Sequence, residues 1–153
     1  MVYDNNFTVS NENQLRSLAF KYDGTKMYVT GNETEVIQQF TLSVPWDVTS
    51  ATKDPTESTA LTAKEGNPRS IQFNSDGTIF YIGGNDTDSI HKYTLSTPWD
   101  VSTLEFSQSY SFRAQVDSSV THSIMAGFIF TANFTKLYIT QDTDSRQSQT
   151  GVN

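Results

Sequence analysis

The sequence predicts an all-β protein built from repeated antiparallel sheets. The main observation is a segment that occurs twice at an offset of 53 residues, from Arg16/Arg69 through Asp47/Asp100. Each copy contains an apolar run, an Asp-Gly pair and a second apolar run, which is the strongest short-range signal for a β-hairpin. No stretch of the chain shows the apolar period of an amphipathic helix.

The first copy is expected to contain two strands around the Asp23-Gly24 turn and a third strand after a second turn. Glycine tolerates the positive φ that such a turn needs, so Gly24 is expected there. A Pro45-Trp46-Asp47 corner follows, and the polar residues 49–59 are expected to form a loop. The expected strands are 15–20, 27–30, 36–42 and, from a weak signal, 60–63.

The second copy repeats this order with a Gly77 turn, expected at positive φ, and a Pro98-Trp99-Asp100 corner. Its fourth strand is better signalled, because aromatic and polar residues alternate over 106–112. The expected strands are 70–73, 79–82, 90–95 and 106–112.

A third, partial copy begins near His122. Residues 128–130 match 71–73 at an offset of 57, whereas Asn133-Phe134 stands in the place of Asp-Gly. We therefore expect a different turn conformation at Phe134. The pattern fails after residue 145. At the other end of the chain, the alternating segment 3–9 is expected to form a strand.

Bulk composition narrows the classes of partner. The net charge is −7 and the pI is about 4.6, so phosphate backbones and anionic lipids are repelled, and neither nucleic acid nor a membrane is an expected partner. The chain has no cysteine, which excludes disulfides and thiolate zinc sites. Residues 1–6 lack the basic and apolar regions of a signal peptide. No cofactor is expected.

A repeat of about 50 residues with four short strands is the signature of β-propeller blades. Residues 23–32, Asp-Gly-Thr-Lys-Met-Tyr-Val-Thr-Gly-Asn, resemble the YVTN-type β-propeller repeat. With its Leu-Ser-x-Pro-Trp-Asp-Val corner, the unit is similar to repeats of marine phage structural proteins and bacterial surface proteins. The resemblance implies about three blades of four-stranded antiparallel sheets: two complete, about 10–63 and 64–114, and a partial third, 115–153.

Two arginines are candidate ligand-binding residues. Arg16 and Arg69 open the first strand of each repeat, and the innermost strand of a propeller blade lines the central channel. There the guanidinium groups would face an anionic ligand. The alternative is a surface or inter-blade ion pair with one of the many carboxylates, as most such pairs are.

The two tryptophans are candidates for stacking on a sugar ring. Trp46 and Trp99 each follow a proline at equivalent corners. The alternative is that each ring packs between neighbouring blades, since repeated aromatic residues usually mark blade packing.

Asp86/Asp88 and Asp142/Asp144 are weak candidates for calcium, but a calcium loop needs more oxygen ligands, so we expect solvated turns and no metal. His91 and His122 fit no triad and no metal spacing. We therefore expect a non-enzymatic structural or decoration component of a phage-like virion, located on a virion or an extracellular surface. The alternative is a lectin-like glycan-binding module or host-surface adhesin, and an enzyme ranks third.

About three blades fall short of the four to eight in a closed propeller. The expected partners are other copies of the chain, other virion or surface proteins, and a possible glycan. The N-terminal segment resembles a fourth strand, so Tyr3 and Phe7 are expected to complete the last blade of a neighbouring copy.

Overall fold

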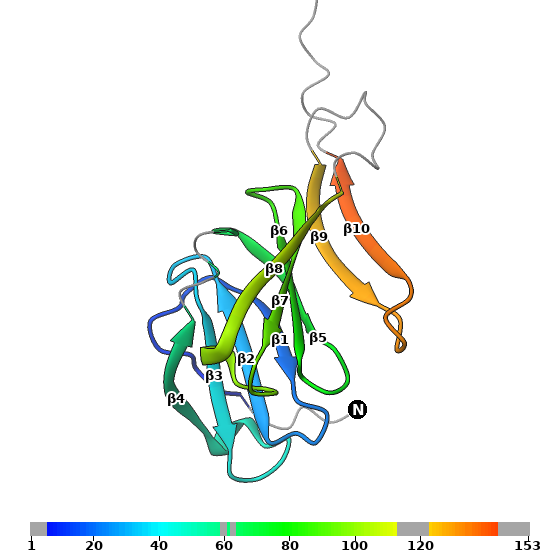
Figure 1. Ribbon diagram of the computed structural model, residues 1–153. Coiled ribbons are helices and arrows are strands. Elements are labelled where there is room, and N and C mark those ends of the chain that lie inside the picture. The colour runs from blue at the N-terminus through cyan, green and yellow to red at the C-terminus, as the bar shows by residue number, and fades with distance from the viewer. Residues whose placement is uncertain (1–5, 59–60, 62–63, 113–122, 144–153) are drawn as a thin grey trace, which may run out of the picture.

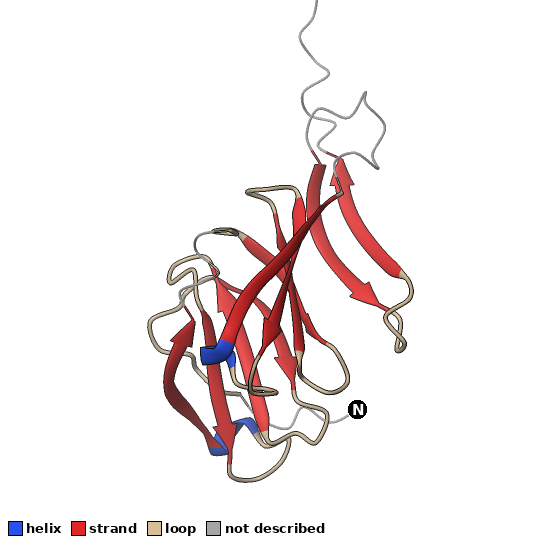
Figure 2. Cartoon of the chain, viewed as in Figure 1, coloured by secondary structure: helices blue, strands red, loops and turns tan. Residues whose placement is uncertain are grey.

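The computed structural model describes residues 6–58, 61, 64–112 and 123–143, which form three antiparallel sheets standing side by side (Figure 1). Strands make up nearly all the regular structure (Figure 2). We call β1–β4 the first blade, β5–β8 the second and β9–β10 the third. The strands are β1 Leu15–Phe20, β2 Lys26–Gly31, β3 Ile37–Leu42, β4 Ala51–Ser58, β5 Pro68–Phe73, β6 Ile79–Gly84, β7 Ser89–Leu95, β8 Leu104–Ser111, β9 Ser123–Phe130 and β10 Leu137–Thr143.

The predicted fold class is confirmed: the first two blades are complete four-stranded antiparallel sheets, and the third is described as two strands. The boundaries 10–63, 64–114 and 115–153 stay predictions. Within the described ranges, no helix is both long and apolar enough to cross a membrane.

The Asp-Gly hairpins form as predicted. Gly24 and Gly77 both adopt φ +74°. The Trp46 ring lies directly on Gly24, where an added Cβ atom would stand 2.5 Å from the indole. The Trp46 amide donates to the Gly24 carbonyl oxygen at 3.0 Å, and Trp99 does the same to Gly77. Each turn therefore requires glycine for two reasons: the backbone has positive φ, and the tryptophan ring leaves no room for a Cβ atom.

The expectation of a different turn at Phe134 is wrong. Phe134 has φ +54°, and its amide donates to the Thr131 carbonyl oxygen at 2.8 Å, as the Gly24 amide does to Lys21 at 2.9 Å. A left-handed conformation is uncommon for a bulky residue. Here packing compensates for the uncommon backbone conformation: the centroid of the Phe134 ring lies 5.4 Å from that of the Phe130 ring. Phe134 thus supplies from within the turn an aromatic ring like the one that tryptophan supplies in the first two blades.

Three local expectations fail. Residues 49–59 were expected to be a loop, but a short 3-10 helix, Val48–Ser50, leads into β4. The strand pairs on one side only, so its polar sequence and Pro55 are tolerated. The expected strands 3–9 and 60–63 are not found where they are described: residues 6–9 are non-strand coil, and Leu61 lies in a turn.

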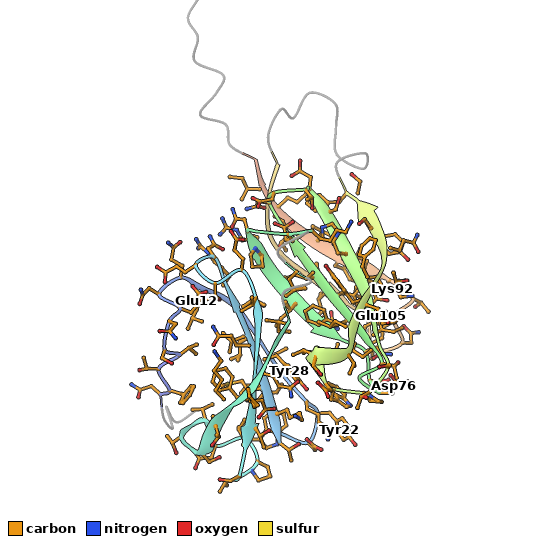
Figure 3. All side chains as sticks on the ribbon, turned by 60° about the vertical axis from the view of Figure 1, so that its left-hand side comes forward. Glu12, Tyr22, Tyr28, Asp76, Lys92 and Glu105 are labelled. Carbon is orange, nitrogen blue, oxygen red and sulfur yellow. The ribbon has the colours of Figure 1, made fainter. Side chains whose placement is uncertain are left out.

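Blades pack through a repeated aromatic contact. Tyr28 of the first blade lies with its ring centroid 4.4 Å from that of Phe73 in the second, and Tyr81 of the second lies 4.4 Å from Phe130 in the third. Figure 3 shows Tyr28 in the interior. Because such rings bury a large area each, this contact stabilises the stacking of one blade on the next.

Candidate functional site

The first strand of each blade lies beside the first strand of the next, so β1, β5 and β9 are neighbours. The Ile71 amide donates to Ser17 Oγ at 3.2 Å, and the Phe130 amide donates to Gln72 Oε1 at 2.8 Å. A side chain of one inner strand therefore accepts a hydrogen bond from an edge amide of the next inner strand. These are the inner strands of the propeller arrangement.

Each inner strand carries a β-bulge at the same place. The register skips one residue between Leu15 and Ser17 in β1 and between Pro68 and Ser70 in β5, and the skip in β9 leaves out Ala126. The unpaired residues are Arg16, Arg69 and Ala126. Because a bulge re-aims the side chain of its extra residue, both candidate arginines leave the regular alternation of their strands.

The two arginines differ in surroundings. Arg16 is exposed and donates to Gln14 Oε1 at 3.2 Å. Arg69 is half-buried, and its Nε atom is shielded from solvent with no hydrogen-bond partner. Among the described residues, neither guanidinium is within salt-bridge distance of a carboxylate. The described residues therefore offer no carboxylate partner for the ion pair considered as the alternative. Both guanidinium groups can bind a carboxylate or phosphate of a ligand.

A buried carboxylate lies beneath the β2–β3 turn of the first blade. Glu12 accepts hydrogen bonds from the Gln14 amide at 3.0 Å and from the Thr34 amide and hydroxyl at 3.1 and 3.0 Å. Burial opposes ionisation, but these bonds outweigh it and lower the pKa of Glu12. Sequence reasoning missed this residue, although the 53-residue offset extends to Glu12/Glu65.

Glu65 is the equivalent residue in the second blade, and it is more deeply buried than Glu12. It accepts from the Asn67 and Asp86 amides, both at 3.1 Å. The Thr87 hydroxyl donates to Glu65 Oε2 at 3.0 Å and lies 2.8 Å from His91 Nε2. Burial raises the pKa of Glu65 and lowers the pKa of His91. This acid–imidazole pair is closed off from solvent, so it positions the turn and does not meet a substrate.

The tryptophans occupy equivalent corners in different surroundings. Trp99 is 9% exposed and lies between blades, 5.2 Å from the Phe73 ring and 6.2 Å from Tyr22 of the first blade. Trp46 is 56% exposed and packs on Phe20, at 5.4 Å, on the free side of the first blade. Trp99 therefore packs between neighbouring blades, which was the alternative to sugar stacking. The Trp46 ring is exposed to solvent.

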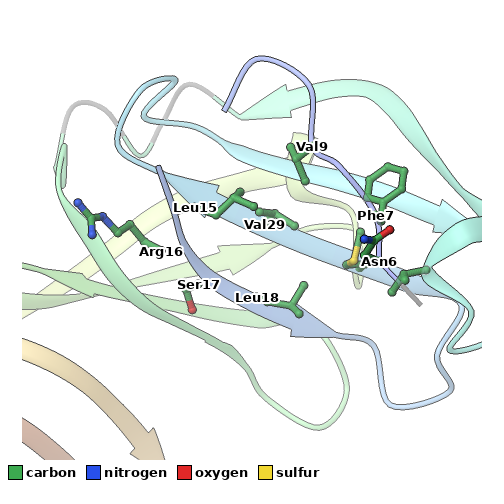
Figure 4. Close-up of a pocket in the computed structure, with 10 residues that line it drawn as sticks. Asn6, Phe7, Val9, Leu15, Arg16, Ser17, Leu18 and Val29 are labelled. Atoms are coloured by element: carbon green, nitrogen blue, oxygen red, sulfur yellow. The ribbon is translucent and has the colours of Figure 1, made fainter. Parts of the chain in front are cut away.

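The N-terminal segment lies against the free side of the first blade. Phe7 packs edge-on against Phe40 of the same chain at 5.4 Å, and Tyr3 lies outside the described residues. Between this segment and β1 is a groove of about 480 Å³ that includes Leu15 and Leu18 (Figure 4). Its lining is mostly apolar, with Arg16, Ser17 and Asn6 as its polar side chains.

The metal candidates gain no support. Among the described residues, no group of three His, Asp or Glu side chains could hold a metal ion. Asp86 and Asp88 lie in the β6–β7 turn, whereas His122, Asp144 and the side chain of Asp142 lie outside the description.

Comparisons with known proteins identify the fold. No protein-family model and no curated protein matches the chain. Solved structures do match. A putative 6-phosphogluconolactonase from Bacteroides fragilis is 17% identical with a TM-score of 0.59, over 87% of this chain and 33% of that chain. One from Bacteroides uniformis is 16% identical with a TM-score of 0.58, over 83% and 33%. A periplasmic gluconolactonase from Pseudomonas aeruginosa is 11% identical with a TM-score of 0.54, over 85% and 34%.

These matches show a β-propeller-type fold, and the chain spans about a third of the length of each structure. They contradict the expected function. A non-enzymatic virion component was expected, with a glycan-binding module or adhesin as its alternative, but these three structures carry the names of enzymes: two putative 6-phosphogluconolactonases and a periplasmic gluconolactonase. The expectation failed because a propeller repeat specifies blade packing and leaves chemistry undetermined.

Proposed function

We propose that this chain is part of a lactonase-like β-propeller that hydrolyses a sugar-acid lactone, and that Arg16 and Arg69 hold the anionic part of the ligand. The observation that carries the proposal is the pair of guanidinium groups at bulged, equivalent positions of adjacent inner strands, without carboxylate partners in the described chain. Binding sites of propellers are reached through the channel that such strands line.

Lactone hydrolysis suits this kind of site. Water forms a bond to the carbonyl carbon, the ring C–O bond breaks, and the product is a hydroxy acid that is a carboxylate at neutral pH. Fixed positive groups stabilise the negative oxygen that develops on this path and bind the product carboxylate. A phosphorylated sugar acid would offer the second arginine a phosphate.

We also propose that the repeated unit is a YVTN-type β-propeller repeat. The Asp-Gly hairpin with its capping tryptophan supports a YVTN-type repeat, in which the packing residues recur while the bulged residue changes between Arg and Ala.

The test is ligand binding by the intact chain. We would measure calorimetric binding of 6-phosphogluconate and gluconate, together with proton release from the corresponding lactones. Arg69→Gln and Arg16→Gln should each weaken binding about tenfold or more, the size expected for a charge-assisted hydrogen bond. Lys136→Gln removes an equal charge from the exposed β9–β10 turn and should leave binding unchanged. Equal affinity in all four proteins would refute the role of the arginines.

A further inference from the structure

The free side of the first blade carries the residues that the second blade buries against the first. Leu18 is 54% exposed, whereas its equivalent Ile71 is 6% exposed. Trp46 and Trp99 differ in the same way. Since the sequence positions and the strand register are the same, the exposed part of this surface, around Leu18 and Trp46, carries the residues of a blade contact without the blade that would cover them.

The third blade exposes the complementary half of that contact. Tyr138 is the equivalent of Tyr28, because each tyrosine stands opposite the matching inner-strand residue, Ile129 in one blade and Ala19 in the other. Tyr28 is fully buried, but Tyr138 is 58% exposed and Ile129 is exposed beside it.

We propose that copies of this chain associate head to tail, with Tyr138 of one copy packed on Phe20 and Trp46 of the next. The geometry is the one that the chain already uses twice. The ring of Tyr138 takes the place of Tyr28 on Phe73, and its hydroxyl donates to the Trp46 carbonyl oxygen as that of Tyr28 does to Trp99 at 2.7 Å.

The occupant is a second copy because both halves of the contact are present in one chain and match its internal contacts. The N-terminal segment covers only part of this surface. Phe7 packs on Phe40 in a buried cluster that includes Val9, Met27 and Val29, whereas Leu18 and Trp46 stay exposed beside it. A contact between two different faces continues the blade series and closes into a ring where the rotation permits.

Sedimentation velocity over a wide concentration series tests the proposal. The wild-type chain should associate, and Tyr138→Glu and Leu18→Glu should each raise the apparent Kd about a hundredfold or more, because each buries an unpaired carboxylate in an apolar contact. An equimolar mixture of the two variants should form a dimer and nothing larger, since each retains one intact face. Tyr110→Glu on β8 is the matched control, because Tyr110 is similarly exposed away from both faces.

Circular dichroism and the thermal midpoint check that each variant folds, and Tyr138→Ser and Leu18→Ser replace a variant that does not. A wild-type chain that stays monomeric at its highest soluble concentration would overturn the proposal. So would a mixture of the two variants that stays monomeric, or single variants that associate as the wild type does. Since the readout is mass, the result is independent of whether the arginines bind a sugar acid.

Discussion

The hydroxyl of Tyr28 donates a hydrogen bond to the backbone carbonyl oxygen of Trp99 at 2.7 Å, across the contact between the first and second blades. Burial raises the pKa of Tyr28, so the phenol stays a donor over the whole accessible pH range. One side chain thus joins the centre of one sheet to the corner of the next.

Tyr28→Phe removes only this hydroxyl. We expect a loss of about 1–2 kcal/mol in the free energy of unfolding, because the Trp99 carbonyl oxygen loses its donor inside the contact. Urea denaturation followed by tryptophan fluorescence measures the change. Tyr22→Phe is the control, since Tyr22 is exposed and should show no shift. Equal midpoints for Tyr28→Phe and the wild type would contradict this account.

The second prediction concerns the tight turns. Gly77→Ala places a Cβ atom at positive φ and against the Trp99 ring, so it should destabilise the fold by about 1 kcal/mol or more. Gly127→Ala is the control: its Cβ atom would stand 3.7 Å from Thr140 Oγ1, an ordinary contact. Chemical denaturation of both variants gives the comparison, and equal losses would show that the turn conformation is not the cause.

The third prediction uses the two equivalent carboxylates, whose pKa values shift in opposite directions. The folded-state pKa of Glu12 is lowered, so its ionised form stabilises the fold above the unfolded pKa of about 4.5, and this stability is lost as the pH falls through the folded pKa. Glu12→Gln should therefore destabilise the chain at pH 7, by an amount that shrinks on acidification.

The folded-state pKa of Glu65 is raised, so its ionisation costs stability as the pH rises from about 4.5 through the folded pKa. Glu65→Gln should gain stability relative to the wild type over that interval. Denaturant midpoints measured as a function of pH give both curves. Parallel curves for the two variants would refute the opposite shifts.

The fourth prediction compares two equivalent asparagines. Asn85 Oδ1 accepts from the Met125 amide at 2.7 Å, whereas Asn32 Oδ1 is buried without a donor, because Pro68 stands where Met125 stands one blade later and has no N–H. Asn85→Ala should cost about 1–3 kcal/mol by leaving an amide unpaired. Asn32→Ala should be close to neutral. Thermal unfolding of both variants measures the two losses of stability. A larger loss for Asn32→Ala than for Asn85→Ala would contradict the proposed difference between the two side chains.

The hairpins could be predicted from the sequence because their signals are local: apolar runs flank Gly24 and Gly77, and both glycines adopt the expected φ. The strand β4 could not, because it is polar and takes its conformation from pairing with β3, which no local pattern records. The turn at Phe134 was mispredicted for a related reason. Its ring stacks on Tyr81 of the second blade, with the ring centroids 6.1 Å apart, and this contact joins residues that are far apart in the sequence.

The candidate site could be predicted only in part. The repeat placed Arg16 and Arg69 on inner strands, but the bulge that sets their direction depends on pairing with β2 and β6. Glu12 and Glu65 were not singled out in the sequence, because a carboxylate next to a turn is usually solvated and no local pattern marks these two as buried. Their burial follows from the fold of the β2–β3 and β6–β7 turns over them.

The bulge on each inner strand also has an evolutionary consequence. Residues 16, 69 and 126 have no cross-strand partner, so the residue there is free of the constraints that preserve the sheet. Gene duplication could therefore multiply the blade unaltered while mutation diversified this one position. Two arginines and an alanine in successive copies fit such a history, in which the paired residues of the sheet are kept and the unpaired residue is replaced.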